Sequence, residues 1–216
     1  MMKMMKKLNH GTDSLKIKFP AMLRILAVTT LAMIFMCGCS AGPMSSLGDA
    51  DTSLTTIPKA DDSGMVAIGK LIKAPAETDG FKLTEYNEAL SASGLIYAAW
   101  TTGEPSAYTN SDEEEVQLYP AQIYMIVYEG TDADDAASKA AGWLAAAEKQ
   151  YNVTQKDESN GRTVLSYSVQ NETSPYSEGT SAFFTDGTAA CCVEVQRTSE
   201  WEGNPGEILA HFLDQL

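Results

Sequence analysis

Two runs of alternating apolar residues flank Asp186-Gly187, and this junction constrains the fold more than any other feature of the chain. Residues 179–185 and 188–197 each have the two-residue period of a strand with two distinct faces. Asp-Gly between such runs is among the strongest signals for a β-hairpin, because both residues tolerate the positive φ of a type I′ turn. A two-residue loop places Phe184 opposite Ala189. We therefore expect an antiparallel hairpin here.

Further strands are expected where β-branched and aromatic residues gather between turn signals. The polar residues 101–115 are expected to form a loop. Ser159-Asn160-Gly161 marks a turn, and Pro120 is expected to bend the strand that contains it. The expected strands cover residues 81–90, 94–100, 116–128, 153–157 and 162–170.

Two segments have the period of an amphipathic helix. Residues 131–151 begin with Thr131 or Asp132 as a cap and have an alanine-rich stripe. A second helix follows Asn204, with Pro205 at its first position, and is expected to run to the C-terminus. The apolar stripes consist of Ala136, Ala140, Trp143, Leu144, Ala147 and Tyr151 in the first helix, and Ile208, Leu209, Phe212, Leu213 and Leu216 in the second.

The order of strands, helix, several strands and helix indicates an α+β fold. We expect an antiparallel β-sheet of about five to seven strands, packed by the central alanine-rich helix and the C-terminal helix. Residues 65–216 are long enough to form one domain with its own core. The order of elements over residues 80–216 is similar to that of PsbP-like domains, at the level of pattern alone.

The N-terminal residues 1–38 have a different character. Residues 25–36 form a 12-residue apolar run that follows a basic segment and ends at Cys37-Gly38-Cys39. This length is typical of a signal-peptide core, whereas a membrane-spanning helix needs about 20 apolar residues. The small Gly38 directly before Cys39 suits cleavage by a signal peptidase, whereas Cys37 follows the bulky Met36.

Residues 25–40 resemble the signal peptide and lipobox of bacterial lipoproteins. The resemblance implies a diacylglycerol on the thiol of Cys39, cleavage before it, and anchoring in membrane lipid; it implies no other cofactor. Met36 stands where this family usually has leucine. An uncleaved anchor helix and an ordinary signal peptide remain alternatives. Residues 97–129 and 208–213 also look like uncharacterised lipoproteins, which implies no activity.

The charge of the chain restricts its partners. The net charge is −14, and residues 39–216 hold 9 Lys and Arg against 28 Asp and Glu. Such an acidic domain lacks the basic patch that nucleic acids require, so no nucleic-acid partner is expected. Residues 39–64 are rich in Ser, Thr, Gly, Pro and Asp and are expected to be a flexible linker. A partner-binding segment is the alternative reading of this stretch.

Few side chains suggest catalytic or metal chemistry. His211 is expected to flank the packing stripe of the last helix rather than to serve a catalytic triad. The acidic run 112–115 lacks the ligand spacing of a calcium site and is expected at a solvated hairpin tip. Cys191 and Cys192 are a candidate redox pair. Because adjacent strand residues point to opposite faces, two free buried thiols are the favoured alternative to a strained vicinal disulfide.

Aromatic residues gather in and near two of the expected strands. Some of them are candidates for a groove that binds a peptide, glycan or lipid, because tyrosine combines apolar area with a polar tip. The alternative is that most of them pack in the core under the two helices. The candidate binding aromatics are Tyr97, Trp100, Tyr108, Tyr119, Tyr124 and Tyr128.

These features predict an exported, lipid-anchored domain facing outside the cytoplasm of a bacterium. We expect a non-catalytic binding or assembly module of the cell envelope, with an envelope protein as partner. A small-ligand carrier or solute receptor is the alternative. An enzyme that uses carboxylates alone is a third possibility, since acids are abundant in the chain.

The intact mass of the protein taken from its own membranes tests the predicted anchor. We expect a denatured mass equal to residues 39–216 plus acyl chains, because cleavage before Cys39 accompanies lipidation in the family it resembles. A native mass recorded first would exceed the denatured mass by the mass of any carried ligand or partner. A denatured mass with residues 1–38 still attached and no lipid would contradict both the anchor and the localisation.

Overall fold

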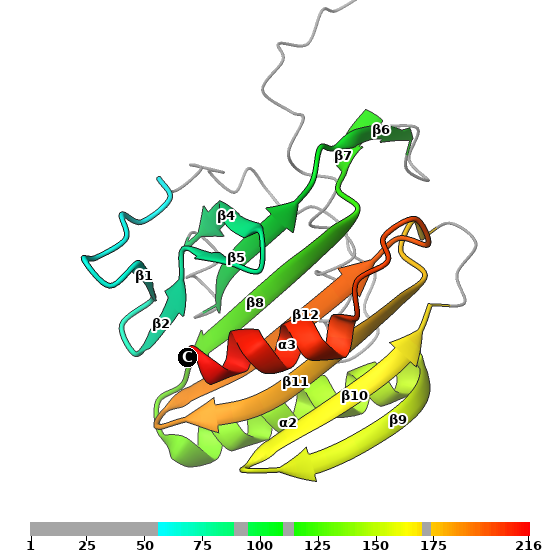
Figure 1. Ribbon diagram of the computed structural model, residues 1–216. Coiled ribbons are helices and arrows are strands. Elements are labelled where there is room, and N and C mark those ends of the chain that lie inside the picture. The colour runs from blue at the N-terminus through cyan, green and yellow to red at the C-terminus, as the bar shows by residue number, and fades with distance from the viewer. Residues whose placement is uncertain (1–55, 89–94, 110–114, 170–173) are drawn as a thin grey trace, which may run out of the picture.

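Figure 1 shows the computed structural model, which describes residues 56–88, 95–109, 115–169 and 174–216. The predicted α+β class is confirmed, with a large antiparallel sheet and two helices in the described residues. The strands are β1 (Met65–Ile68), β2 (Ile72–Pro75), β3 (Glu77–Thr78), β4 (Phe81–Asn87), β5 (Leu95–Thr102), β6 (Ser106–Thr109), β7 (Glu115–Leu118), β8 (Ala121–Glu129), β9 (Asn152–Ser159), β10 (Arg162–Ser168), β11 (Glu178–Asp186) and β12 (Ala189–Arg197). The helices are α2 (Ala133–Gln150) and α3 (Pro205–Asp214).

The main sheet has eight strands in the order β3-β4-β5-β8-β12-β11-β10-β9, and every neighbouring pair is antiparallel. It follows that β8 and β9 run in the same direction with three strands between them. A connection between parallel strands must cross a face of the sheet. Helix α2 makes this connection, and it packs chiefly on β11 and β12.

The expected number of strands was too low. The main sheet alone has eight, and the pairs β1–β2 and β6–β7 form separate two-stranded sheets. The strands absent from the prediction are two to four residues long, too short for an alternating pattern to emerge. In particular, residues 106–109 within the expected loop form β6. The expected bend at Pro120 is a complete break between β7 and β8.

The hairpin at Asp186-Gly187 is confirmed, but its register was wrong by two residues. Asp186 pairs with Ala189, so the loop consists of Gly187 and Thr188, and Phe184 lies opposite Cys191. Gly187 has a φ of 57°, whereas Thr188 has no positive φ. A positive φ at the first loop residue alone is typical of a type II′ turn, whereas the type I′ turn expected for Asp-Gly needs a positive φ at both loop residues. A two-residue shift leaves every side chain on its predicted face.

Both helices begin where their caps predicted. The Asp132 side chain accepts a hydrogen bond from the Asp135 amide at 2.8 Å, and Asn204 accepts one from the Gly206 amide at 2.9 Å. The alanine-rich stripe of α2 is buried at Ala136, Ala140, Trp143 and Ala147. Small side chains on this stripe let the helix approach the sheet closely. Helix α3 ends at Asp214, slightly before the expected end of the chain.

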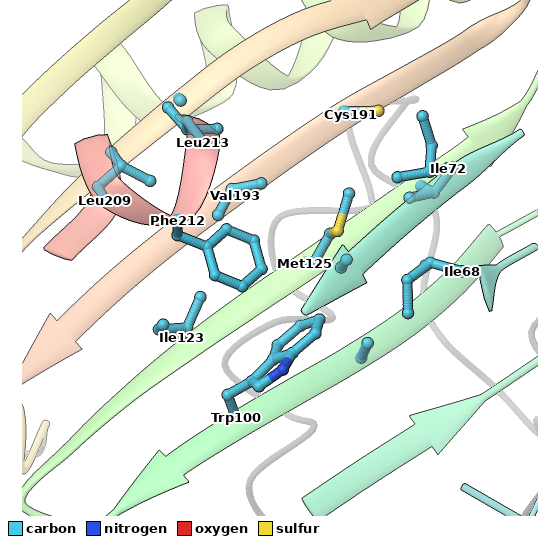
Figure 2. Close-up of a cluster of buried hydrophobic side chains, with 14 of the residues drawn as sticks. Ile68, Ile72, Trp100, Ile123, Met125, Cys191, Val193, Leu209, Phe212 and Leu213 are labelled. Atoms are coloured by element: carbon cyan, nitrogen blue, oxygen red, sulfur yellow. The ribbon is translucent and has the colours of Figure 1, made fainter. Parts of the chain in front are cut away.

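The two helices lie on opposite faces of the sheet (Figure 1). We call the side that carries α3 and the β1–β2 hairpin the α3 face, and the opposite side the α2 face. The α3 face is an apolar core, and Figure 2 shows part of it. Its buried residues include Ile68 and Ile72 from the hairpin, Trp100, Ile123, Met125, Cys191 and Val193 from the sheet, and Leu209, Phe212 and Leu213 from α3.

Trp100 joins three parts of the α3 face. Its indole Nε1 donates a hydrogen bond of 2.7 Å to the buried carbonyl oxygen of Pro75 in β2. Its ring meets the ring of Phe212 edge to face, with centroids 5.0 Å apart (Figure 2). Such pairs add stability beyond the area they bury. The indole therefore attaches both the β1–β2 hairpin and α3 to β5.

The described end of the expected linker is tied to this hairpin. The Asp61 side chain accepts hydrogen bonds from the Met65 amide at 3.1 Å and from Lys73 Nζ at 2.8 Å. Together with a hydrogen bond from Ser63, the Lys73 bond holds the pKa of Asp61 below its ordinary value. The folded part of the chain thus includes Asp61, a few residues before the expected boundary.

Trp100→Phe should lower the free energy of unfolding by about 2–3 kcal/mol. The substitution leaves a small cavity and removes the donor to the buried Pro75 carbonyl. Urea unfolding measures the change. Trp201→Phe is the matched control, because Trp201 is half-buried and contacts Phe81 at the periphery with ring centroids 5.8 Å apart. Equal losses in the two variants would show that Trp100 has no special structural role.

Candidate functional site

The α2 face of the sheet is apolar at one end and polar at the other. Under α2 lie Ile126, Phe183 and Cys192. At the other end lies a group of buried or half-buried titratable side chains that we call the tyrosine–glutamate cluster. It consists of Glu85, Tyr97, Tyr124, Tyr151, Tyr167, Tyr176 and Glu194.

The strand register brings these residues together from distant parts of the chain. Facing residues on neighbouring strands form rows that cross the sheet. The first row is Glu85, Ala99, Tyr124, Glu194, Ser181 and Leu165. The next is Thr101, Gln122, Gln196, Gly179 and Tyr167. Polar groups that are far apart in sequence therefore meet on one buried surface.

Glu194 is the centre of the cluster. Its carboxylate oxygen Oε1 accepts short hydrogen bonds from the Tyr167 hydroxyl and from Gln196 Nε2, and a longer one of 3.4 Å from the Tyr151 hydroxyl. The residue is only 8% exposed. Burial disfavours the charged form and raises the pKa of Glu194, although these hydrogen bonds act in the opposite direction. The carboxyl therefore keeps its proton to a higher pH than an exposed glutamate.

Two tyrosines next to Glu194 are stacked. The rings of Tyr151 and Tyr167 are nearly parallel, with centroids 4.0 Å apart. Tyr151 follows the last residue of α2, so the stack connects that helix to β10. Gly179 leaves the space for this arrangement, since a Cβ there would lie 2.5 Å from the Tyr167 hydroxyl oxygen. A larger residue at position 179 would displace the phenol from Glu194.

The cluster continues toward the β4 edge of the sheet. The rings of Tyr97 and Tyr124 have centroids 5.8 Å apart, and hydrogen bonding links the Tyr124 and Tyr176 hydroxyls. Beyond Tyr97 lies Glu85, a half-exposed residue whose pKa is raised mainly by burial. Burial likewise raises the pKa of Tyr97 and Tyr124 well above the ordinary value. These phenols therefore stay protonated and act as hydrogen-bond donors rather than as nucleophiles.

Ser181 Oγ and Gln196 Oε1 are buried polar atoms on this surface that have no hydrogen-bond partner among the described residues, and both residues are at most 2% exposed. Most buried polar groups in proteins are paired, because an unpaired one costs about 1–3 kcal/mol. A hydroxyl and an amide oxygen at this end of the sheet are thus left unsatisfied by the described residues.

The six candidate binding aromatics do not form one groove. Tyr97 and Tyr124 meet in the cluster, whereas Trp100 lies on the opposite face against Phe212. Tyr128 is on the α2 face but at its other end, where its hydroxyl donates to Asp135 at 2.9 Å. Tyr108 lies in β6, and Tyr119 lies beside β7 with its hydroxyl 3.4 Å from Gln117 Oε1.

Sequence reasoning missed most of the cluster. The two-residue period of the runs 179–185 and 188–197 places Ser181 and Glu194 on one face, and their pairing agrees with this. A glutamate inside a run of buried strand residues is a signal that could have pointed to an internal polar site. Tyr151 was expected in the apolar stripe of the first helix, Tyr167 and Glu85 were expected only as strand residues, and Tyr176 was in no expected element.

Cys191 and Cys192 are both buried and free. Cys191 belongs to the core of the α3 face and Cys192 to that of the α2 face, as the strand period predicts. A disulfide between them would require both thiols on the same side. Burial also raises the pKa of both thiols, to about 12 for Cys191, so they are poor nucleophiles in the folded protein.

Other candidates from the sequence have structural partners. His211 Nδ1 lies 2.6 Å from Asp79 Oδ2, on the side of the molecule away from the cluster. Asp135 accepts hydrogen bonds from Thr131 and Tyr128, which lower its pKa. Within the described ranges, no three His, Cys, Asp or Glu residues are arranged to hold a metal ion. Most of the acidic run, residues 112–114, lies outside these ranges.

Cys39 and the expected signal peptide also lie outside the described residues. Neither helix of the described part is long and apolar enough to cross a membrane. No protein-family model matches the sequence, and no curated protein matches it significantly.

Glu194→Gln should make stability less dependent on pH. The raised pKa of Glu194 means that its contribution to stability is fully present below the unfolded value of about 4.5 and is lost as the pH rises through the folded value. Glutamine keeps an acceptor oxygen but never ionises. We expect the wild type to lose up to about 1.4 kcal/mol per pH unit in this window relative to the variant.

Urea unfolding between about pH 4.5 and 8 measures this difference. Glu148→Gln is the control, because it removes one negative charge from an exposed pair with Lys156 at 2.9 Å. Parallel pH profiles for the wild type and Glu194→Gln would contradict the assignment of a protonated, buried Glu194.

Proposed function

We propose that this chain is a non-catalytic binding module of the bacterial cell envelope, anchored in membrane lipid through Cys39 and facing outside the cytoplasm. The tyrosine–glutamate cluster is its ligand site. The anchor rests on the resemblance of residues 25–40 to a lipoprotein signal. The ligand site rests on the geometry of the α2 face.

One observation carries the ligand site: a polar surface with unpartnered groups in the interior of an otherwise apolar sheet. The α3 face shows that this chain can build an apolar core from the same strands. Yet β12 places Glu194 and Gln196 inside, although apolar residues of similar size would avoid the cost of burying them. Retained polar groups of this kind are typical of binding sites, where convergent donors and acceptors orient a ligand.

The same geometry favours binding over catalysis. The hydroxyls of the cluster are phenols whose pKa values are raised by burial, so they are weak nucleophiles at neutral pH. His211 is bonded to Asp79 and lies away from Glu194. A base that activates a hydroxyl must be within hydrogen-bond reach of it. The cluster can therefore recognise a molecule by hydrogen bonds and aromatic contact.

Assembly with an envelope protein is the second candidate. It is favoured by the strands β6 and β7, which form a two-stranded sheet of their own within the described residues and extend from the end of the main sheet (Figure 1). Most side chains of these two strands are exposed. A protein partner would find an accessible surface there.

Native mass spectrometry of protein extracted from its own membranes tests the proposal. We expect the wild type to carry an additional small molecule. Tyr124→Phe should reduce its occupancy about fivefold, the effect of losing one hydrogen bond worth about 1 kcal/mol. Tyr128→Phe is the matched control, since Tyr128 lies on the same strand and face but bonds to Asp135.

A wild type without any small molecule would overturn the ligand site. Should a second protein be recovered instead, the assembly function would replace it. Equal loss of the ligand in both variants would show that the cluster does not hold it.

A further inference from the structure

The tyrosine–glutamate cluster contains two carboxyl groups but no cationic side chain among the described residues. Lys149, in the last turn of α2, is exposed, and three further lysines on the α2 face have other partners. Lys82 lies 3.6 Å from Glu77, Lys156 lies 2.9 Å from Glu148, and Lys139 lies over the ring of Tyr128. The two arginines in the described residues lie on the α3 face, where Arg162 donates to the Leu213 carbonyl oxygen and Arg197 pairs with Glu178.

A buried carboxyl group without a cation must keep its proton or acquire a positive partner. Glu194 has neighbours that donate to it, but each is neutral: Tyr167, Tyr151 and Gln196. The other titratable groups that act on this part of the α2 face are Tyr97, Tyr124, Tyr176, Cys192 and Glu85. None of them supplies a positive charge.

The side chains around Glu194 are of the kinds that can bind an amine. Tyrosine rings attract a cation through their faces, most strongly where water is excluded. The buried acceptor Gln196 Oε1 has no donor, and it belongs to the amide whose Nε2 already bonds to Glu194. An ammonium group offers three N–H donors and one positive charge. The acidic domain as a whole also attracts cations from solution.

We propose that the tyrosine–glutamate cluster binds the protonated amino group of a small primary amine, and that the amine replaces the proton of Glu194. The inference rests on the ligand site proposed above and names the class of its ligand. The bond that breaks is the carboxyl O–H of Glu194, and its proton passes to solvent. The ion pair that forms joins the carboxylate to the incoming ammonium, so charge is conserved.

Isothermal titration calorimetry on the protein extracted from its membranes tests this inference, with n-pentylamine as the probe. Binding should release up to about one proton per amine and should tighten up to about tenfold per pH unit while Glu194 is still protonated. Titrations in buffers of different ionisation enthalpy count the protons. The quaternary analogue, pentyltrimethylammonium, lacks N–H donors and should bind at least several-fold more weakly.

Glu194→Gln should weaken binding of n-pentylamine at least tenfold and abolish proton release. Glu148→Gln, which makes the same replacement of glutamate by glutamine on the exposed surface of α2, should bind like the wild type. Similar loss in both variants would mean that general charge, and not the cluster, attracts the amine, and would overturn the inference.

Absence of n-pentylamine binding at millimolar concentration, or preferential binding of pentanoate, would also overturn it. Failure of this inference is distinct from failure of the binding function. A small molecule on the native protein, sensitive to Tyr124→Phe and without an amino group, would sustain the binding module while rejecting the amine.

Discussion

Burial of β12 on both faces is the constraint on which the rest of this structure depends. The strand lies between β8 and β11, with α3 packed on one side and α2 on the other. Its apolar residues alternate between the two cores, as Cys191 and Cys192 illustrate. No side chain of a central strand in this position reaches solvent freely, so Glu194 and Gln196 must find partners inside the protein.

This requirement connects the stability of the fold to its candidate site. The partners of Glu194 come from β10 and from Tyr151 at the end of α2, so one carboxyl links the helix to the sheet. Breaking a buried polar network at one member is costly, whereas an apolar replacement of the whole network is often neutral. Retaining the network therefore has no advantage for folding alone, which fits a role in recognition.

Local patterns predicted the elements well because their causes are local. The caps at Asp132 and Asn204 act within one helical turn, and strand alternation follows from the backbone itself. Predictions failed where short strands had too few residues to show a period. The hairpin register failed because either Asp186-Gly187 or Gly187-Thr188 could form its two-residue loop. Among the aromatic candidates, Tyr97 and Trp100 lie on the same strand, β5, and their odd spacing places them on opposite faces, so the strand period alone separates them.

The sequence by itself determined the α+β class, the two helices, and which residues of β11 and β12 share a face. The resemblance of residues 25–40 to a lipoprotein signal stays a prediction. Only the tertiary structure decided that α2 and α3 cover opposite faces and that β8 pairs with β12. Hydrophobic burial is non-directional, so an apolar stripe does not specify its partner. The tyrosine–glutamate cluster arises from that strand order, because it brings Glu85, Tyr124 and Glu194 into one row.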